Sequence, residues 1–280
     1  MVVGDHFDRL LANSYNLTIL IRVSGLSYAV LDPVSNTYVA YGDLSLDHPD
    51  IHYAAQEEYL LREDIFKFCF RKVNVTIDAP MRTVVPKDLR VPDEERNARL
   101  LSFAGYTIEK DSIVLYDDVD LASCSVVYSI PKFLYFFIKT QFQNAKITHL
   151  YTSELSALLL KRVEADLESK MTVSMSSNIM SVIVITNGVL KLVSSYGYRN
   201  VNDVVYNVVN VLKQLQLEEK NTLISFGGDI AGRRDELFDV MCKFASNISL
   251  DTWPSYFVYD FGKSCEDYNF AALFRVATCE

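Results

Sequence analysis

One order of predicted strands and helices occurs twice along this chain, and that repeat limits the possible folds more than any single motif does. Each half reads as three strands, a helix, a strand, a second helix and a further strand. Three consecutive strands joined by short turns indicate an antiparallel meander, and strands separated by helices indicate parallel crossovers. Each half is therefore expected to form a mixed sheet with helices on its faces, which gives an α/β protein of two similar lobes.

In the first half, the meander is predicted from β-branched, apolar stretches separated by Gly25 and by the Pro-containing turn at 32–36. Asp50 suits the N-cap of the helix that follows it, and Pro131 suits the first position of another helix. A segment at about 80–130 interrupts the repeat and is interpreted as an insertion. The predicted strands are Leu17–Val23, Ser27–Leu31, Thr37–Leu44, Lys72–Asp78, Thr83–Val85, Ile113–Tyr116, Ala122–Ser129 and Lys146–Tyr151, and the predicted helices are Ile51–Arg62, Glu94–Ala104, Pro131–Asn144 and Ser153–Glu168.

The second half carries the clearest local signals. Asn187-Gly188 between two apolar stretches predicts a type I′ hairpin turn, and the apolar residues of Val201–Leu215 share one helical face. We assign the first lobe to residues 1–169 and the second lobe, with a C-terminal helical tail, to residues 170–280. The other predicted strands are Met171–Met175, Met180–Thr186, Leu190–Ser195, Leu223–Phe226 and Ile248–Leu250, followed by an aromatic loop over Trp253–Phe261, and the other helices are Arg233–Ala245 and Tyr268–Ala277.

Composition excludes several classes of protein. Half of the residues are hydrophobic, which is enough for a packed core, and the net charge of -9 disfavours general binding to nucleic acid. The five cysteines form no CxxC pair, so neither a disulfide framework nor a zinc site is expected, and a reducing cytoplasm is the predicted location. No signal peptide and no apolar run long enough to span a bilayer is visible.

Two lobes of this plan resemble the actin-like ATPase superfamily, which includes actin, hexokinase and the sugar kinases and is built from ribonuclease-H-like lobes. Three stretches are similar to an uncharacterised Bacteroidetes domain-of-unknown-function family that is placed with this fold. They are "TVVPKDL" (Thr83–Leu89), "AKITHLYTSELSALLL" (Ala145–Leu160) and the longer segment Val182–Gly228. These stretches are apolar patterns and turns, so the resemblance implies a fold and supplies no activity.

The resemblance also implies where ATP chemistry should lie. In the superfamily, an Asp-x-Gly hairpin in each lobe holds Mg²⁺ and phosphates. Here Arg22 stands about where the first aspartate is expected, and the second hairpin, within Met171–Thr186, contains no Asp or Glu. A cation cannot hold Mg²⁺, and phosphoryl transfer without metal ligands loses its main charge stabilisation. We therefore expect neither ATP hydrolysis nor kinase activity, and no cofactor.

A candidate nucleotide site remains at Gly227, Gly228 and Asp229, with Arg22 as a candidate anion ligand. In active relatives a similar Gly-Gly turn packs against adenosine, and the N-terminus of the following helix favours anions. The alternative is a tight strand-to-helix turn that needs glycine only for a positive φ, with Arg22 covering the sheet surface. The Gly-Gly-Asp sequence also occurs in cyclic-dinucleotide synthases, but there it lies in a β-hairpin, whereas a helix follows here.

Other groups of residues have ordinary structural explanations. His48 and His52 could chelate zinc if both lay on a helix, but Asp50 between them fits helix capping better. The aspartates Asp117, Asp118 and Asp120 lack the further ligands of a Ca²⁺ loop and fit a solvated turn. Cys265 and Cys279 have no activating histidine nearby in sequence. The aromatic helix around Phe133–Phe142 is interpreted as buried, with a partner surface as the alternative.

Two functional hypotheses follow. The first is a non-catalytic actin-like module that binds an unknown protein partner or associates with itself, because the fold is kept while its phosphate hairpins are changed. The second is a divergent nucleotide-binding protein or enzyme that uses the interlobe cleft around Gly227-Gly228.

Overall fold

The computed structural model describes residues 2–4, 7–50, 52–90, 93–160, 167–176, 178–230, 232–261 and 270–276. The chain divides into two compact units. The first comprises Met1–Ser156, Ser255–Ser264 and Leu273–Glu280, and the second comprises Ala157–Pro254 and Cys265–Ala272. The expected α/β architecture of two lobes with mixed sheets is confirmed, while the lobe boundaries 1–169 and 170–280 stay a prediction. None of the described helices is long and apolar enough to cross a membrane.

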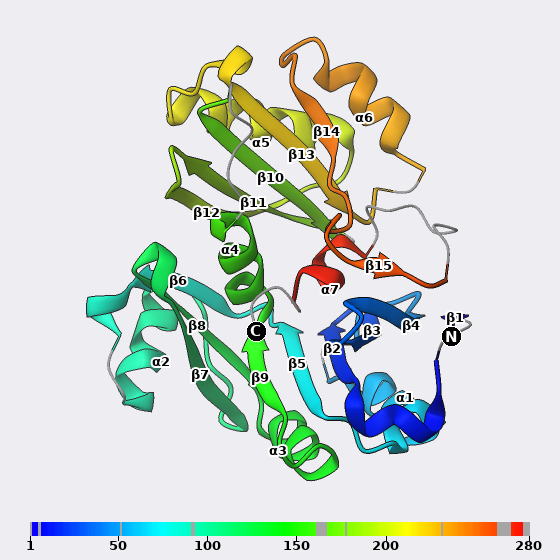
Figure 1. Cartoon of the computed structure of the whole chain (residues 1–280). Coiled ribbons are helices and arrows are strands. Elements are labelled where there is room, and N and C mark those ends of the chain that lie inside the picture. Colours follow the sequence, from blue (N-terminus) through cyan, green and yellow to red (C-terminus); the bar gives the residue numbers. More distant parts are fainter. Residues whose placement is uncertain are drawn as a thin grey trace. The chain divides into compact units, whose positions relative to one another are not determined.

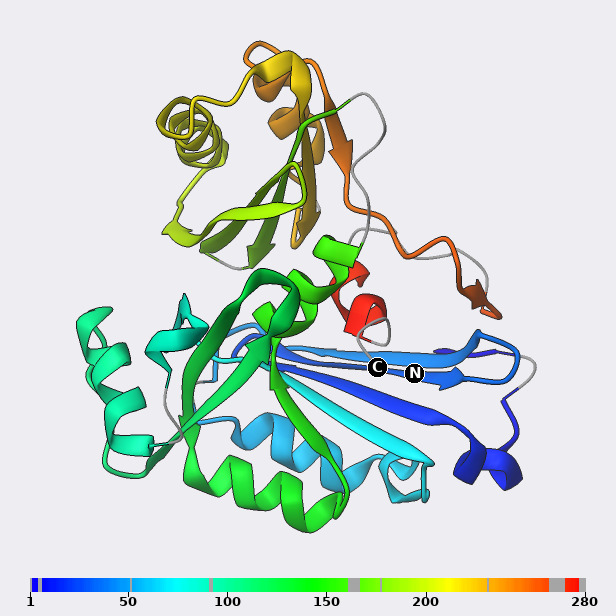
Figure 2. The same ribbon diagram turned by 60° about the vertical axis from the view of Figure 1, so that its left-hand side comes forward.

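The first unit is built on a mixed sheet in the order β1-β4-β3-β2-β5-β9, with β15 also paired to β4. The expected meander is present as β2, β3 and β4, while β5 and β9 run parallel to β2. Helices α1 and α3 lie on one face of this sheet (Figure 2). The bounds are β1 Val2–Val3, β2 Asn16–Arg22, β3 Gly25–Asp32, β4 Thr37–Ser45, β5 Lys72–Asp78, β9 Lys146–His149, β15 Val258–Tyr259, α1 Ala54–Arg62 and α3 Lys132–Gln141. Helices α4 (Leu150–Leu160) and α7 (Ala271–Val276) each have residues in both units, because the second unit includes α4 from Ala157 on and α7 up to Ala272.

The insertion in the first lobe forms a small antiparallel sheet between β5 and α3. Its strands β6 (Arg82–Pro86), β8 (Cys124–Pro131) and β7 (Ser112–Val119) follow this order in space, and α2 (Glu94–Phe103) packs on one side (Figure 1). Leu101 of α2 lies in a buried cluster with Val114 and Val127 of the sheet. Asp93 caps α2 by accepting a hydrogen bond from the backbone N–H of Arg96.

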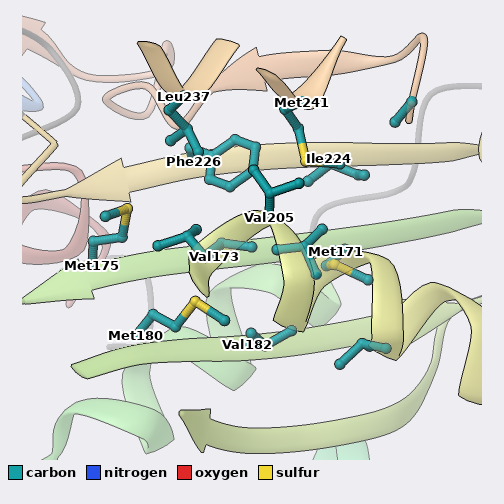
Figure 3. Close-up of a cluster of buried hydrophobic side chains, with 14 of the residues drawn as sticks. Met171, Val173, Met175, Met180, Val182, Val205, Ile224, Phe226, Leu237 and Met241 are labelled. Atoms are coloured by element: carbon teal, nitrogen blue, oxygen red, sulfur yellow. The ribbon is translucent and has the colours of Figure 1, made fainter. Parts of the chain in front are cut away.

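The second unit is a five-stranded sheet in the order β12-β11-β10-β13-β14, with α5 and α6 sharing its core. Figure 3 shows the methionine, valine and phenylalanine side chains of alternate strand positions meeting Val205 of α5 and Leu237 of α6. Asn187 and Gly188 both have positive φ, 51° and 74°, which confirms the type I′ turn. The bounds are β10 Ser169–Ser176, β11 Ile179–Thr186, β12 Val189–Gly197, β13 Thr222–Gly228, β14 Ile248–Leu250, α5 Val201–Gln214 and α6 Arg234–Met241.

The two units share one topology. Reading outward from the meander, β4-β3-β2-β5-β9 of the first unit corresponds to β12-β11-β10-β13-β14 of the second. In each case the first three strands are antiparallel, the fourth strand (β5 or β13) pairs in parallel with the third, and the fifth (β9 or β14) pairs in parallel with the fourth. The repeat predicted from sequence is therefore a repeat of structure.

Several predicted boundaries are wrong. Helix α1 begins at Ala54 because Tyr53 is left-handed, although Asp50 still accepts hydrogen bonds from the N–H groups of His52 and Ala55. Pro131 precedes α3 as its N-cap. Helix α4 begins before Ser153, residues 161–166 of its predicted continuation lie outside the described part, and the predicted aromatic loop contains β15.

The aromatic helix α3 is not surrounded by other elements. Leu134 and Ile138 are fully buried on one face, whereas Phe133 and Phe136 are 43% and 60% exposed. The interpretation of this helix as buried is therefore correct for one face only, and the opposite face is exposed.

Candidate functional site

Arg22 ends β2 at the first hairpin, where the superfamily would place a metal-binding aspartate. Its Nη2 donates to Ser27 Oγ at 2.6 Å and lies 3.3 Å from Asp43 Oδ1, and Ser27 in turn donates to Asp43. The three residues lie on adjacent strands of the meander. Arg22 and Asp43 side chains are only 22% and 26% exposed.

The charge of Arg22 is balanced inside the fold. Burial lowers the pKa of its guanidinium from the ordinary value, and the carboxylates of Asp43 and Asp78 oppose that shift. Arginine nevertheless stays protonated under all ordinary conditions. The hairpin thus holds a fixed cation that already has a carboxylate partner, and this arrangement favours neither Mg²⁺ nor a free anion. Asp43 was missed in the sequence because it is 21 residues from Arg22.

The predicted Gly227-Gly228-Asp229 turn lies at the end of β13 in the second unit, so it is described apart from Arg22. Gly228 has φ +81°, and a Cβ there would overlap the carbonyl oxygen of Met175 on the neighbouring strand β10. A Cβ on Gly227 would lie 2.9 Å from Cβ of Asp251. The packing of the chain on itself is therefore sufficient reason for both glycines.

Asp229 is exposed, and its backbone N–H donates to Met175 O at 2.8 Å. This bond ties the turn to β10 and directs the chain toward α6. The N-cap of α6 is Arg233, whose side chain makes no capping bond and instead lies over the ring of Tyr198, with 5.7 Å between guanidinium carbon and ring centroid. The turn is accordingly well braced by contacts within its own unit.

Metal chemistry finds no support among the described residues. His48 and His52 both precede α1, so they do not have the helical spacing that could chelate zinc, and the interpretation of this segment as an ordinary helix start is retained. No group of three or more His, Cys, Asp and Glu side chains placed for a metal ion occurs in the part of the chain that the structure describes. Cys265 and Cys279 lie outside that part.

The neighbouring aspartates Asp117, Asp118 and Asp120 of the insertion have separate roles. Asp118 accepts from Arg90 Nη2 at 2.5 Å and from Ser125, and Asp120 pairs with Lys87. Asp117 lies on the opposite side of β7, because successive strand residues face opposite ways. The interpretation as a fully solvated turn is therefore wrong for Asp117, which accepts from the N–H of His149 at 2.6 Å and from Thr152 Oγ1 at 2.9 Å.

A buried polar network connects the insertion to the sheet of the first unit. The ring of His149 is fully buried, its Nε2 lies 3.2 Å from Ala79 O, and its Nδ1 accepts from the N–H of Tyr151. Burial and the nearby charge of Arg82 lower the pKa of His149 to about 3, so the ring is neutral at physiological pH. A histidine with both nitrogens engaged and this pKa serves the fold and is unsuited to general base catalysis.

Replacing Asp117 with Asn should change how stability depends on pH. Burial raises the pKa of Asp117 to about 6, against about 3.9 for an ordinary aspartate. A raised folded-state pKa means that the stabilising contribution is full below about pH 4 and is lost as pH rises through 6. As pH rises from 4 to 7, the unfolding free energy of Asp117→Asn should therefore increase relative to that of wild type by about 1–3 kcal/mol. Each unit of pKa difference corresponds to about 1.4 kcal/mol.

Urea unfolding at several pH values measures this difference. Asp88→Asn, at an exposed position in the same insertion, is the matched control. An unfolding free-energy difference between Asp117→Asn and wild type that stays constant from pH 4 to 7 would contradict the assignment.

Comparison with known proteins agrees with this architecture. A protein from Bacteroides thetaiotaomicron with an actin-like ATPase fold and unknown function is similar over 98% of this chain and 99% of its own, with 19% identity and a TM-score of 0.78. The PilM–PilN type IV pilus biogenesis complex matches at 10% identity over 95% and 97%, with a TM-score of 0.58. Ethanolamine utilization protein EutJ from Carboxydothermus hydrogenoformans matches at 7% identity over 99% and 92%, with a TM-score of 0.52.

These likenesses establish the actin-like ATPase fold and carry no function across. No curated protein gives a significant match. A family model described as "Protein of unknown function (DUF3822)" matches residues 5–248. The match spans most of the sequence, and the chain therefore belongs to the DUF3822 family of proteins of unknown function.

Proposed function

We propose that this protein is a non-catalytic member of the actin-like ATPase fold that acts by binding another protein or a second copy of itself. The observation that carries the proposal is the pairing of Arg22 with Asp43 at the first hairpin. A guanidinium held there by a carboxylate and a hydroxyl leaves Mg²⁺ without its expected ligand and repels it by charge. The second hairpin, between β10 and β11, has no acidic residue to compensate.

The alternative is a divergent nucleotide-binding protein or enzyme that uses the Gly227-Gly228-Asp229 turn. The packing of both glycines against Asp251 and Met175 weakens this alternative, because no ligand is needed to account for them. A protein-binding role is compatible with the fold, since a structurally similar chain comes from the PilM–PilN type IV pilus biogenesis complex. A surface can carry function when the fold has lost its chemistry.

Titration calorimetry with ATP, ADP and GTP in the presence of Mg²⁺ tests the first half of the proposal. We expect no saturable heat at nucleotide concentrations up to about 1 mM. A site half-saturated at that concentration would have a binding free energy of about −4 kcal/mol, so any stronger specific site would be detected. Saturable micromolar binding of any of the three nucleotides would overturn it.

Sedimentation velocity of the purified chain and crosslinked affinity capture from its own cells test the second half. We expect either a concentration-dependent oligomer or one protein retained in stoichiometric amount. A chain that stays monomeric and retains no protein contradicts the interaction role, whatever the nucleotide result.

A further inference from the structure

The sheet of the first unit has an apolar face and a buried polar face. Alternate residues of β2 and β5 point to opposite sides, and the side that includes Leu17, Ile19, Ile21, Val75 and Ile77 is apolar. The other side carries amide and hydroxyl residues that are at most 4% exposed, namely Asn16, Thr18, Asn74 and Thr76. A buried polar group without a partner costs about 1–3 kcal/mol. A sequence that places four of them on one face requires polar partners there.

A pocket of about 120 Å³ opens on this polar face. Strands β5, β7 and β9 and helix α4 contribute polar residues to its wall, and Val276 of α7 is the single apolar lining residue. An apolar cavity of this size can stay dry, whereas a polar one holds water or a polar solute. The polar lining residues are Asn74, Asp118, Lys146, Thr148, Thr152, Ser153 and Ser156.

The hydroxyl groups on α4 turn hydrogen-bond acceptors toward the pocket. Thr152 Oγ1 uses its proton to donate to Asp117, and Ser156 Oγ donates to the carbonyl of Thr152 at 2.8 Å. Because each hydroxyl already uses its one proton in a hydrogen bond, its oxygen can take part in further hydrogen bonds only as an acceptor. A solute that fits must therefore offer hydrogen-bond donors to α4.

The opposite requirement comes from Lys146 at the start of β9. Its side chain is exposed and makes no ion pair or hydrogen bond with any residue in the described ranges. Asp118, the other charged lining residue, is already paired with Arg90. The pocket thus has one cation that no carboxylate of the described residues contacts directly, beside a wall of acceptors, and the charge of Asp117 acts on this cation from a longer distance.

We propose that this pocket binds a small carboxylic acid with a hydrogen-bond donor on the adjacent carbon, that is, an α-hydroxy or α-amino acid. The carboxylate pairs with Lys146, and the adjacent hydroxyl or ammonium group donates to Thr152 and Ser156. A cavity of about 150 Å³ accommodates benzene, so a pocket of about 120 Å³ suits molecules of roughly six heavy atoms. The site lies wholly within the first unit and is independent of the nucleotide question.

The probes are lactate and glycine. Acetate, which lacks the hydrogen-bond donor, and glycerol, which lacks the carboxylate, are the controls. Each compound is titrated into the full chain, and binding is followed by ligand-observed NMR. We expect saturable binding of lactate or glycine, and at least about tenfold weaker binding of acetate and glycerol. The stronger of the first two identifies the hydroxy or amino source.

Variants separate a built site from surface adsorption. Lys146→Met should weaken the preferred probe about tenfold or more, while Lys110→Met, at an exposed lysine of the insertion, should leave binding unchanged. Ser156→Val should also weaken binding, because it fills the pocket and removes an acceptor. Absence of saturable binding at tens of millimolar, equal binding of acetate, or full binding by Lys146→Met would each overturn the proposal.

Discussion

Arg275→Leu should lower the unfolding free energy of the protein by about 3–5 kcal/mol, because it leaves a buried carboxylate without its counter-charge. Arg275 on α7 donates from both Nε and Nη2 to Glu154 Oε1 on α4, at 3.1 Å and 2.7 Å. The two side chains are only 9% and 4% exposed. Both residues belong to the first unit, so the ion pair connects the end of α7 to α4 within that unit.

Urea unfolding followed by circular dichroism measures this effect. The matched control is Arg99→Leu, which breaks the exposed pair with Glu95 and should cost less than about 1 kcal/mol. Replacing Arg275 and Glu154 together with leucine should recover most of the loss, since no buried charge then remains. Equal losses for the Arg275 and Arg99 variants, or an additive double variant, would contradict a buried, coupled pair.

The sequence predicted best where structure depends on neighbours along the chain. Lys72–Asp78 and Ile248–Leu250 match β5 and β14 at both ends, and Asn187-Gly188 forms the turn that its backbone preferences require. Strand periodicity and glycine at positive φ are local properties. They were sufficient to derive the repeated topology of an α/β protein with two lobes, while the actin-like fold was implied by the resemblance.

Predictions failed where distant residues decide. Helix α4 begins at Leu150, where the ring of His149 accepts the N–H of Tyr151 and Asp117 of the insertion, 32 residues away, accepts the N–H of His149. The start of this helix therefore depends partly on a residue that is distant in the sequence. Strand β15 pairs with β4, which is far away in the sequence, and the residues around 258 show no local pattern that predicts a strand.

The same distinction applies to the candidate site. The sequence identified Arg22 as unusual because a hairpin position can be located by pattern. Its neutralisation by Asp43 and Ser27 depends on the register of three strands and became visible only in the structure. Likewise the glycine turn was located correctly, but the contact that accounts for Gly228 comes from β10, on the other side of a long crossover.

Gly228→Ala should destabilise the protein by about 2–5 kcal/mol, because two separate costs coincide there. A side chain at φ +81° costs about 1–2 kcal/mol, and the new Cβ would overlap backbone atoms of Met175, for which a further 1–3 kcal/mol is typical of overpacking. The clash is with a strand carbonyl in the middle of a sheet, so relief requires β10 or β13 to move. Figure 3 places Met175 on β10 and Phe226 on β13 within the packed core.

Two other glycines separate these costs. Gly105 has φ +89° and open space around it, so Gly105→Ala should show the conformational cost alone, about 1 kcal/mol. Gly197 has ordinary φ and no atom within 4 Å of a built Cβ, so Gly197→Ala should be neutral or slightly stabilising. Thermal and urea unfolding should therefore show that Gly228→Ala is much less stable than Gly105→Ala, and that Gly105→Ala is less stable than Gly197→Ala. If Gly228→Ala were no more destabilising than Gly105→Ala, packing would not account for this glycine, and the case for a ligand at Gly227-Gly228-Asp229 would be reopened.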